Sequence, residues 1–157
     1  MRSVFEMLNE MAVSSAIRES LWMVAAINAT HLLFLAMFAG AVLVVDLRLV
    51  GYGFRDQPPA HVARDAQPWL ISALIGLTIT GSAQLVSNAL RQYNSYLFWI
   101  KMTILLVALL YTFTLRRSVT LAEEAAVAPV VRKAVGLISL ALWAAVIVSA
   151  RLIGLFT

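Results

Sequence analysis

Four polar residues stand inside long apolar runs of this 157-residue chain: His31, Gln84, Lys101 and Arg151. A neutral imidazole can ligate haem iron or copper, relay protons, or bond to a neighbouring hydroxyl. Lysine and arginine side chains can hold anionic groups such as haem propionates, and a glutamine amide can orient a ligand. These residue types predict a binding site for a redox cofactor or a polar ligand, with His31 as metal ligand or proton partner.

The elements that carry these residues are four apolar segments, at about residues 24–45, 69–89, 96–115 and 134–156. A helix rises about 1.5 Å per residue and a bilayer core is about 30 Å thick, so each segment can span a membrane. His31 lies roughly 10 Å inside one end of the first span, and the other three residues lie about five positions from the same end of theirs. The sequence therefore predicts one polar layer to which every span contributes.

The predicted fold class is all-α, a four-transmembrane-helix bundle in residues 20–157 that follows an amphipathic interfacial helix in residues 1–19. In this first segment apolar residues recur at helical spacing and acidic residues take the other side. A frayed tail is the alternative, because Ser14 and Ser15 weaken the pattern.

Composition agrees with a membrane protein. The chain is 62% apolar and 13% charged, whereas soluble domains are roughly 45–50% apolar and about 25% charged. The net charge of +4 comes from basic residues at the ends of apolar runs, so it indicates topology and not nucleic-acid binding. The lack of cysteine excludes disulfides, cysteine-ligated clusters and covalent haem. No catalytic triad, carboxylate pair, phosphate loop or zinc motif is present, so catalysis by side chains alone is not expected.

Basic residues also predict the orientation. One side of the membrane has seven: Arg48, Arg55, Arg64, Arg116, Arg117, Arg132 and Lys133. The other side has three, Arg2, Arg18 and Arg91, or five when Lys101 and Arg151 are counted with it. Because cytoplasmic loops are rich in Lys and Arg, both termini are predicted to lie outside the cytoplasm.

Structural alternatives exist for the charged residues. Lys101 and Arg151 are near enough to the interface to snorkel, and either could pair with Glu19. At the opposite end of the first span, Asp46 and Arg48 are predicted to form a local ion pair or to bond to loop backbone.

The histidines also have alternatives. His31 could bond to the stripe of Thr80, Gln84 and Ser87 on the second span. His61 is predicted in a loop on the other side of the membrane as a solvated residue, so one chain cannot supply two histidines to one haem. A haem would need a weaker second ligand, or His31 of a second copy of the chain.

Several short runs together resemble a family of uncharacterised bacterial four-helix inner-membrane proteins. The runs are Ile17 to Trp22, Asp46 to Leu49, Pro68-Trp69, Thr80-Gly81, Tyr96 to Lys101, and Ser139 to Trp143, together with His31, Gly40 and Arg151. The family has the look of copper-resistance-D and cytochrome b561 type membrane proteins, which implies a haem or copper role for His31. Near the end of the third span the chain has Tyr111 to Thr114 where the resemblance leads one to expect a histidine.

The leading functional expectation is a small membrane subunit that binds a haem-like redox cofactor, haem b, or a quinone-like ligand in the outer half of the bundle. It would act as a homo-oligomer or as a subunit of a membrane complex. The alternatives are a non-catalytic scaffold or oligomerising subunit, and a path for a metal ion or small solute. Lys101 and Arg151 argue against a cation path through their layer by repulsion.

Overall fold

The computed structural model describes residues 6–7, 10, 15, 17, 19–53, 56–123 and 125–156, with Leu90 and residues 152–156 described by backbone alone. Four helices in these ranges are long and apolar enough to cross a membrane, which confirms the predicted fold class. Most of the predicted interfacial helix, residues 1–19, lies outside the described residues.

The first and second spans are the helices α3 (Leu21–Val50) and α4 (Pro59–Ser87). The short helix α5 (Ala89–Tyr93) links α4 to the third span. That span consists of α6 (Tyr96–Tyr111), a π-helical turn η1 (Thr112–Arg116) and α7 (Arg117–Leu121), and the fourth span is α8 (Pro129–Phe156).

Helix α4 begins earlier than the sequence predicts. Pro58 and Pro59 start the helix, because proline is well suited to the first helical turn, and the chain then continues as one helix through Pro68. The span predicted at about residues 69–89 is therefore part of a longer helix, Pro59–Ser87. Pro68 leaves one backbone carbonyl without its helical partner, which a helix tolerates where neighbours or water can satisfy that carbonyl.

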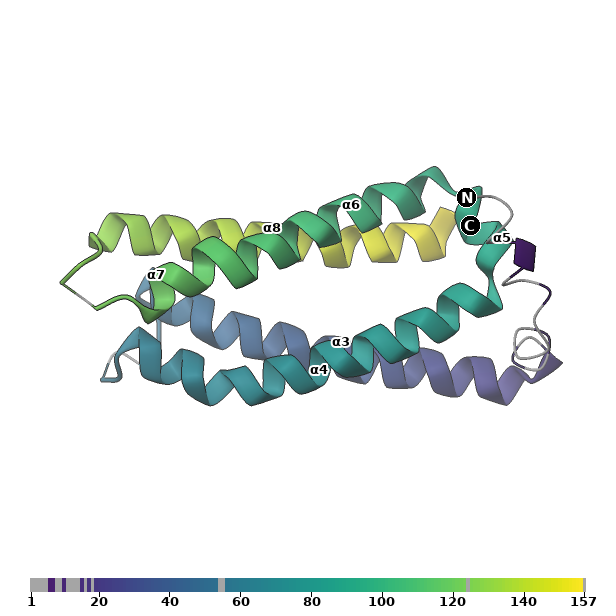
Figure 1. Cartoon of the computed structure of the whole chain (residues 1–157), viewed down its shortest axis with the longest axis horizontal. Coiled ribbons are helices and arrows are strands. Elements are labelled where there is room, and N and C mark those ends of the chain that lie inside the picture. The colour runs from purple at the N-terminus through teal and green to yellow at the C-terminus, as the bar shows by residue number, and fades with distance from the viewer. Residues whose placement is uncertain are drawn as a thin grey trace.

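The four long helices form two layers. In Figure 1, α3 and α4 lie side by side in one layer, and α6 and α8 lie side by side in the other. Helix α8 also packs against α3 and so joins the layers. We call the half of the bundle that contains Leu21, Ser87 and α5 the α5 half, and the half that contains Val50, Pro59 and α7 the loop half.

Close approach of the helices depends on two glycines. A Cβ atom added to Gly76 on α4 would come within 2.5 Å of the Phe34 ring on α3, so that ring packs directly on the glycine. A Cβ atom on Gly136 of α8 would come within 3.0 Å of the Asp46 carbonyl oxygen, so α8 and α3 nearly touch in the loop half.

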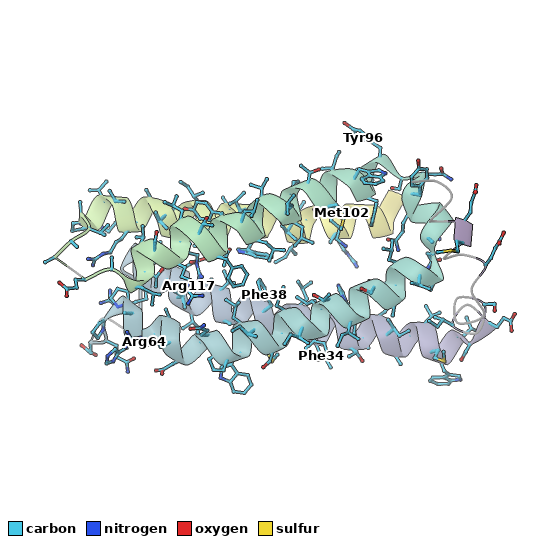
Figure 2. The ribbon with its side chains drawn as sticks, in the orientation of Figure 1. Phe34, Phe38, Arg64, Tyr96, Met102 and Arg117 are labelled. Atoms are coloured by element: carbon cyan, nitrogen blue, oxygen red, sulfur yellow. The ribbon has the colours of Figure 1, made fainter. Side chains whose placement is uncertain are left out.

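The core of the bundle is small and lies near its middle. It contains Phe38 and Val42 from α3, Ala73 from α4, Ala108 from α6 and Trp143 from α8. Phe38, which is fully buried, lies between the two layers (Figure 2). By contrast, large apolar side chains on every span are exposed, such as Leu33 (71%), Ile79 (66%), Leu110 (57%) and Val148 (57%). This exposed apolar surface is the surface that a lipid bilayer covers.

Candidate functional site: a cavity in the α5 half and a closed ion pair in the loop half

The α5 half contains a partly open cavity of about 710 Å³ between the two layers. All four spans and α5 contribute to its wall, and most of the wall is apolar, with Leu35, Leu77, Leu105, Val146 and Ile147 among its residues. His31, Gln84 and Lys101 line this one cavity. Three of the four residues that the sequence singled out are therefore brought together.

His31 is held by a hydroxyl on the neighbouring helix. Its Nδ1 lies 2.7 Å from Thr80 Oγ1, and that hydroxyl donates to the Gly76 carbonyl oxygen at 2.7 Å. A hydroxyl has one hydrogen to donate, so Thr80 accepts the bond from His31 Nδ1–H. The neutral ring therefore keeps its lone pair on Nε2, which no described residue bonds. The predicted stripe on the second span does supply the partner of His31, through Thr80.

Gln84 forms hydrogen bonds through both its side chain and its backbone carbonyl. Its side-chain Nε2 donates to Asn28 Oδ1 on α3 at 3.0 Å, and its backbone carbonyl accepts from Gln92 Nε2 on α5 at 3.0 Å. The Ser87 hydroxyl bonds to the same carbonyl at 2.9 Å and not to His31. Gln84 thus ties α3, α4 and α5 together at the wall of the cavity, which also includes Asn28 and Gln92.

Lys101 is a charged group within electrostatic range of the His31 imidazole, and its side chain is partly buried. Among the described residues, no hydrogen bond or ion pair is found for its ammonium group. Glu19, the acidic residue predicted as a partner for Lys101 or Arg151, is exposed and makes neither pair. The cavity wall, as far as the structure describes it, contains no aspartate or glutamate.

Arg151 lies outside the cavity wall. Its side chain is exposed, whereas its neighbour Ala150 faces the cavity, so the rotation of α8 separates the two. An exposed arginine near a helix end fits the snorkelling alternative. A different arginine, Arg91 on α5, lines the cavity instead. Its position in a short turn at the same end of the bundle as Lys101 is the feature of the sequence that could have identified Arg91.

Two aromatic rings form the floor of the cavity. Phe38 and Trp143 both line it, and their ring centroids are 4.5 Å apart at an interplanar angle of 59°. Trp143 Nε1 donates to Thr112 Oγ1 at 3.1 Å, below the floor. The cavity therefore ends at the Phe38–Trp143 ring pair. A second polar region lies on the other side of this pair, in the loop half.

That second region is a buried ion pair in the loop half. Arg116 Nε donates to Asp46 Oδ1 at 2.5 Å, and its Nη2 donates to the Val42 carbonyl at 3.2 Å. Asp46 is 0% exposed and Arg116 is 5% exposed. The predicted local pair of Asp46 with Arg48 is wrong, because Asp46 faces the interior. Arg48 donates to the Gln57 backbone oxygen at 2.6 Å, which is the loop-backbone contact that the sequence left open.

The π-helical turn η1 presents Thr112 and Arg116 to the interior, where both are buried. It stands in the segment where a histidine was expected by resemblance. Tyr111, the residue before it, donates to the Val135 carbonyl on α8 at 3.0 Å. Irregular π turns are often found at functional places in helices, and here the turn aims a cation at Asp46. Asp46 Oδ2 and Ser139 Oγ are buried beside this pair without a hydrogen-bond partner.

His61 is exposed on the first turn of α4 in the loop half and does not line the cavity, so His31 is the only histidine in the described part of that wall. Among the described residues no group of three or more His, Cys, Asp or Glu side chains could hold a metal ion. A metal at His31 would therefore need ligands of another kind or from another chain.

Fold and site together define a multi-pass α-helical membrane protein with two separate polar regions inside its bundle. The chain belongs to a family of unknown function, DUF6644, whose model matches residues 11–156. No curated protein and no solved structure matches it. The likeness to copper-resistance-D and cytochrome b561 type proteins stays a prediction.

Proposed function

We propose that this protein is a small membrane subunit that binds an amphipathic redox cofactor, haem-like or quinone-like, in the cavity of the α5 half. One observation carries the proposal: His31, Gln84 and Lys101 line a single cavity whose remaining wall is mostly apolar. Cofactor sites are typically apolar cavities of about 300–1,000 Å³ with a few convergent polar groups. The polar groups would orient the head of the ligand, and the apolar wall would hold its body.

A quinone-like ligand would bond to two groups that have no hydrogen-bond partner among the described residues. The Lys101 ammonium can donate to a quinone carbonyl, and His31 Nε2 can accept a proton from the hydroxyl of the reduced form. Thr80 supports this role, because it fixes the ring with Nδ1–H toward the protein. The two groups come from opposite layers of the bundle.

A haem-like cofactor also fits in part. His31 Nε2 has the lone pair that iron requires, and Lys101 and Arg91 are placed to hold propionates. The described part of the wall supplies one histidine, so a second iron ligand would have to be a weaker one or come from a second copy of the chain. Met102 is a thioether in the same wall. Bound haem would supply one-electron chemistry.

An absorption spectrum of the purified protein separates these versions. We expect a Soret band that is lost in His31→Ala if the cofactor is haem, and an extractable quinone in a colourless protein otherwise. Thr78→Ala is the matched control, since Thr78 lines the same wall and bonds only to the Leu74 carbonyl of its own helix. A colourless protein whose organic extract contains no quinone would refute the proposal.

The proposal includes a location in the bacterial inner membrane with both termini outside the cytoplasm. Arg64 and Arg117 lie in the loop half (Figure 2), as do Arg48, Arg132 and Lys133, and an excess of basic residues favours the cytoplasmic side. A cysteine placed at Ala125, between α7 and α8, should be inaccessible to a membrane-impermeant maleimide in intact cells. Labelling at that position without permeabilisation would reverse the orientation.

A further inference from the structure

The cavity of the α5 half has an uncompensated positive charge. Lys101, which is partly buried, and Arg91, which is exposed, both line it, and neither has an ion-pair partner among the described residues. The described wall contributes no acidic side chain, and Glu19 is exposed elsewhere. An ionised group inside a bilayer is costly unless it is paired or hydrated. Among the described residues, no acidic side chain offsets this cost for the partly buried Lys101.

The loop half shows how the same chain treats a cation that it does compensate. Arg116 is buried against Asp46 and also bonds to a backbone carbonyl. Arg151 and Arg91, two further cations of the α5 half, are exposed, although Arg91 also lines the cavity. Lys101 follows neither pattern, because it is partly buried beside a large cavity and has no partner in the described chain.

We propose that the ligand of this cavity carries a carboxylate or phosphate group that pairs with Lys101 and Arg91, with its apolar body directed toward Phe38 and Trp143. This inference rests on the proposed function in so far as it takes the same cavity to be a ligand site, and it specifies the charge of the ligand, which haem and acidic lipids share. The Lys101 and Arg91 side chains supply up to eight N–H donors between them, three from the ammonium and five from the guanidinium. Asn28 and Gln92 are neutral groups of the same wall that can complete the hydrogen bonding.

The class of ligand follows from the positive charge of the cavity and from its mostly apolar wall. A simple anion would leave the apolar wall wet, and a neutral amphiphile would leave the partly buried Lys101 without a counter-charge. A porphyrin with propionates, a fatty acid and an anionic phospholipid share the required chemistry. A neutral quinone does not, so the inference favours the haem-like version or an acidic lipid over a plain quinone.

The test uses a pair of probes that differ only in charge, 11-(dansylamino)undecanoic acid and its methyl ester. The full-length protein is placed in phosphatidylcholine nanodiscs, with empty nanodiscs as the blank, and binding is followed by energy transfer from tryptophan. We expect the acid to bind at least about ten-fold more tightly than the ester, because charge-assisted hydrogen bonds contribute about 1.5–3 kcal/mol each. Equal affinity of the two probes would overturn the inference while leaving a ligand cavity in place.

Substitutions of single cations show which residues cause the preference for the acid probe. Lys101→Met and Arg91→Gln should each weaken acid binding about ten-fold and leave ester binding unchanged, while Lys101→Arg should retain acid binding. Arg151→Gln is the matched control, since it removes a cation at the same end of the bundle but outside the wall. A loss in Arg151→Gln equal to that in Lys101→Met would overturn the inference, because a diffuse surface charge would then explain the preference.

A competition experiment with an anionic lipid distinguishes a lipid phosphate from a carboxylate. It also separates the anionic-ligand inference from the redox-cofactor proposal. If phosphatidylglycerol in the nanodisc competes with the acid probe, the anion is a lipid phosphate, a result that supports the inference and counts against a redox cofactor. If it does not compete, the anion is a carboxylate of a cofactor or fatty acid; both results support the inference. If neither probe binds and the purified protein carries no extractable amphiphile, the proposed function fails together with the inference.

Discussion

The two halves of the bundle treat buried charge in opposite ways. In the loop half, Asp46 and Arg116 form an ion pair that is buried among the packed helices. In the α5 half, Lys101 stands beside a cavity of about 710 Å³ with no counter-charge from the described residues. Both halves lie in the same membrane, so lipid alone does not explain the difference. The cation of the loop half has a counter-charge within the chain, whereas Lys101 has none among the described residues, and this contrast supports the proposed ligand of the α5 half.

The largest change in stability is expected when the cation of the loop half is removed. Arg116→Gln should lower the free energy of unfolding by about 3–5 kcal/mol, because it leaves the Asp46 carboxylate buried and unpaired. Denaturation in mixed detergent and SDS, followed by circular dichroism, measures the change. Arg117→Gln is the control, since Arg117 is the adjacent exposed residue and should change stability little.

The double variant Asp46→Leu with Arg116→Leu completes this test. It should recover a large part of the loss, because an apolar pair of similar size has no charge to desolvate. If Arg116→Gln and Arg117→Gln unfold at the same denaturant concentration, the ion pair is not what closes the loop half.

A smaller effect of opposite sign is expected in the α5 half. Lys101→Met should raise the free energy of unfolding of the ligand-free protein by about 1 kcal/mol, because it removes a cation that the described residues do not compensate. The same denaturation measurement applies, with Arg151→Met as the exposed control. A destabilisation as large as that of Arg116→Gln would mean that Lys101 has a structural partner, and the contrast between the halves would fail.

The smallest effect concerns the floor between the halves. Trp143→Phe removes the bond from Nε1 to Thr112 Oγ1, and a hydrogen bond between membrane helices contributes about 0.6 kcal/mol on average. A double-mutant cycle with Thr112→Val measures the coupling of the two side chains. Zero coupling would show that the floor is held by ring packing of Phe38 and Trp143 alone.

The sequence was sufficient to predict the four spans, because long apolar runs carry that information directly. It was also sufficient for the contact of His31 with Thr80, since a polar stripe at helical spacing has to face a polar partner in lipid. The start of α4 was missed because polar residues and Pro68 look like a loop. A helix can extend past the bilayer core at no cost to its polar side chains.

The ion pair was missed for a different reason. Asp46 and Arg116 are 70 positions apart, and each stands at the edge of an apolar run, where a charge is ordinarily read as an interfacial anchor. Arg48 offered a closer partner in sequence. Which edge residue turns inward depends on the rotation of each helix, which is set by contacts such as that of Gly136 with Asp46. The same uncertainty of rotation placed Arg151 in the predicted layer and left Arg91 out of it.

The separation of Asp46 from Arg116 also has a consequence for biogenesis. At about 5–20 residues per second, the 70 positions between them take roughly 4–14 s to translate, so the carboxylate emerges well before its partner. Until then α3 carries a lone acid at the end of its apolar stretch, and that acid stays hydrated only while it remains at the bilayer surface. Full burial of α3 must therefore wait for the third span. A nascent chain that stops short of Arg116 would present the unmatched acid to the quality-control proteases of the membrane.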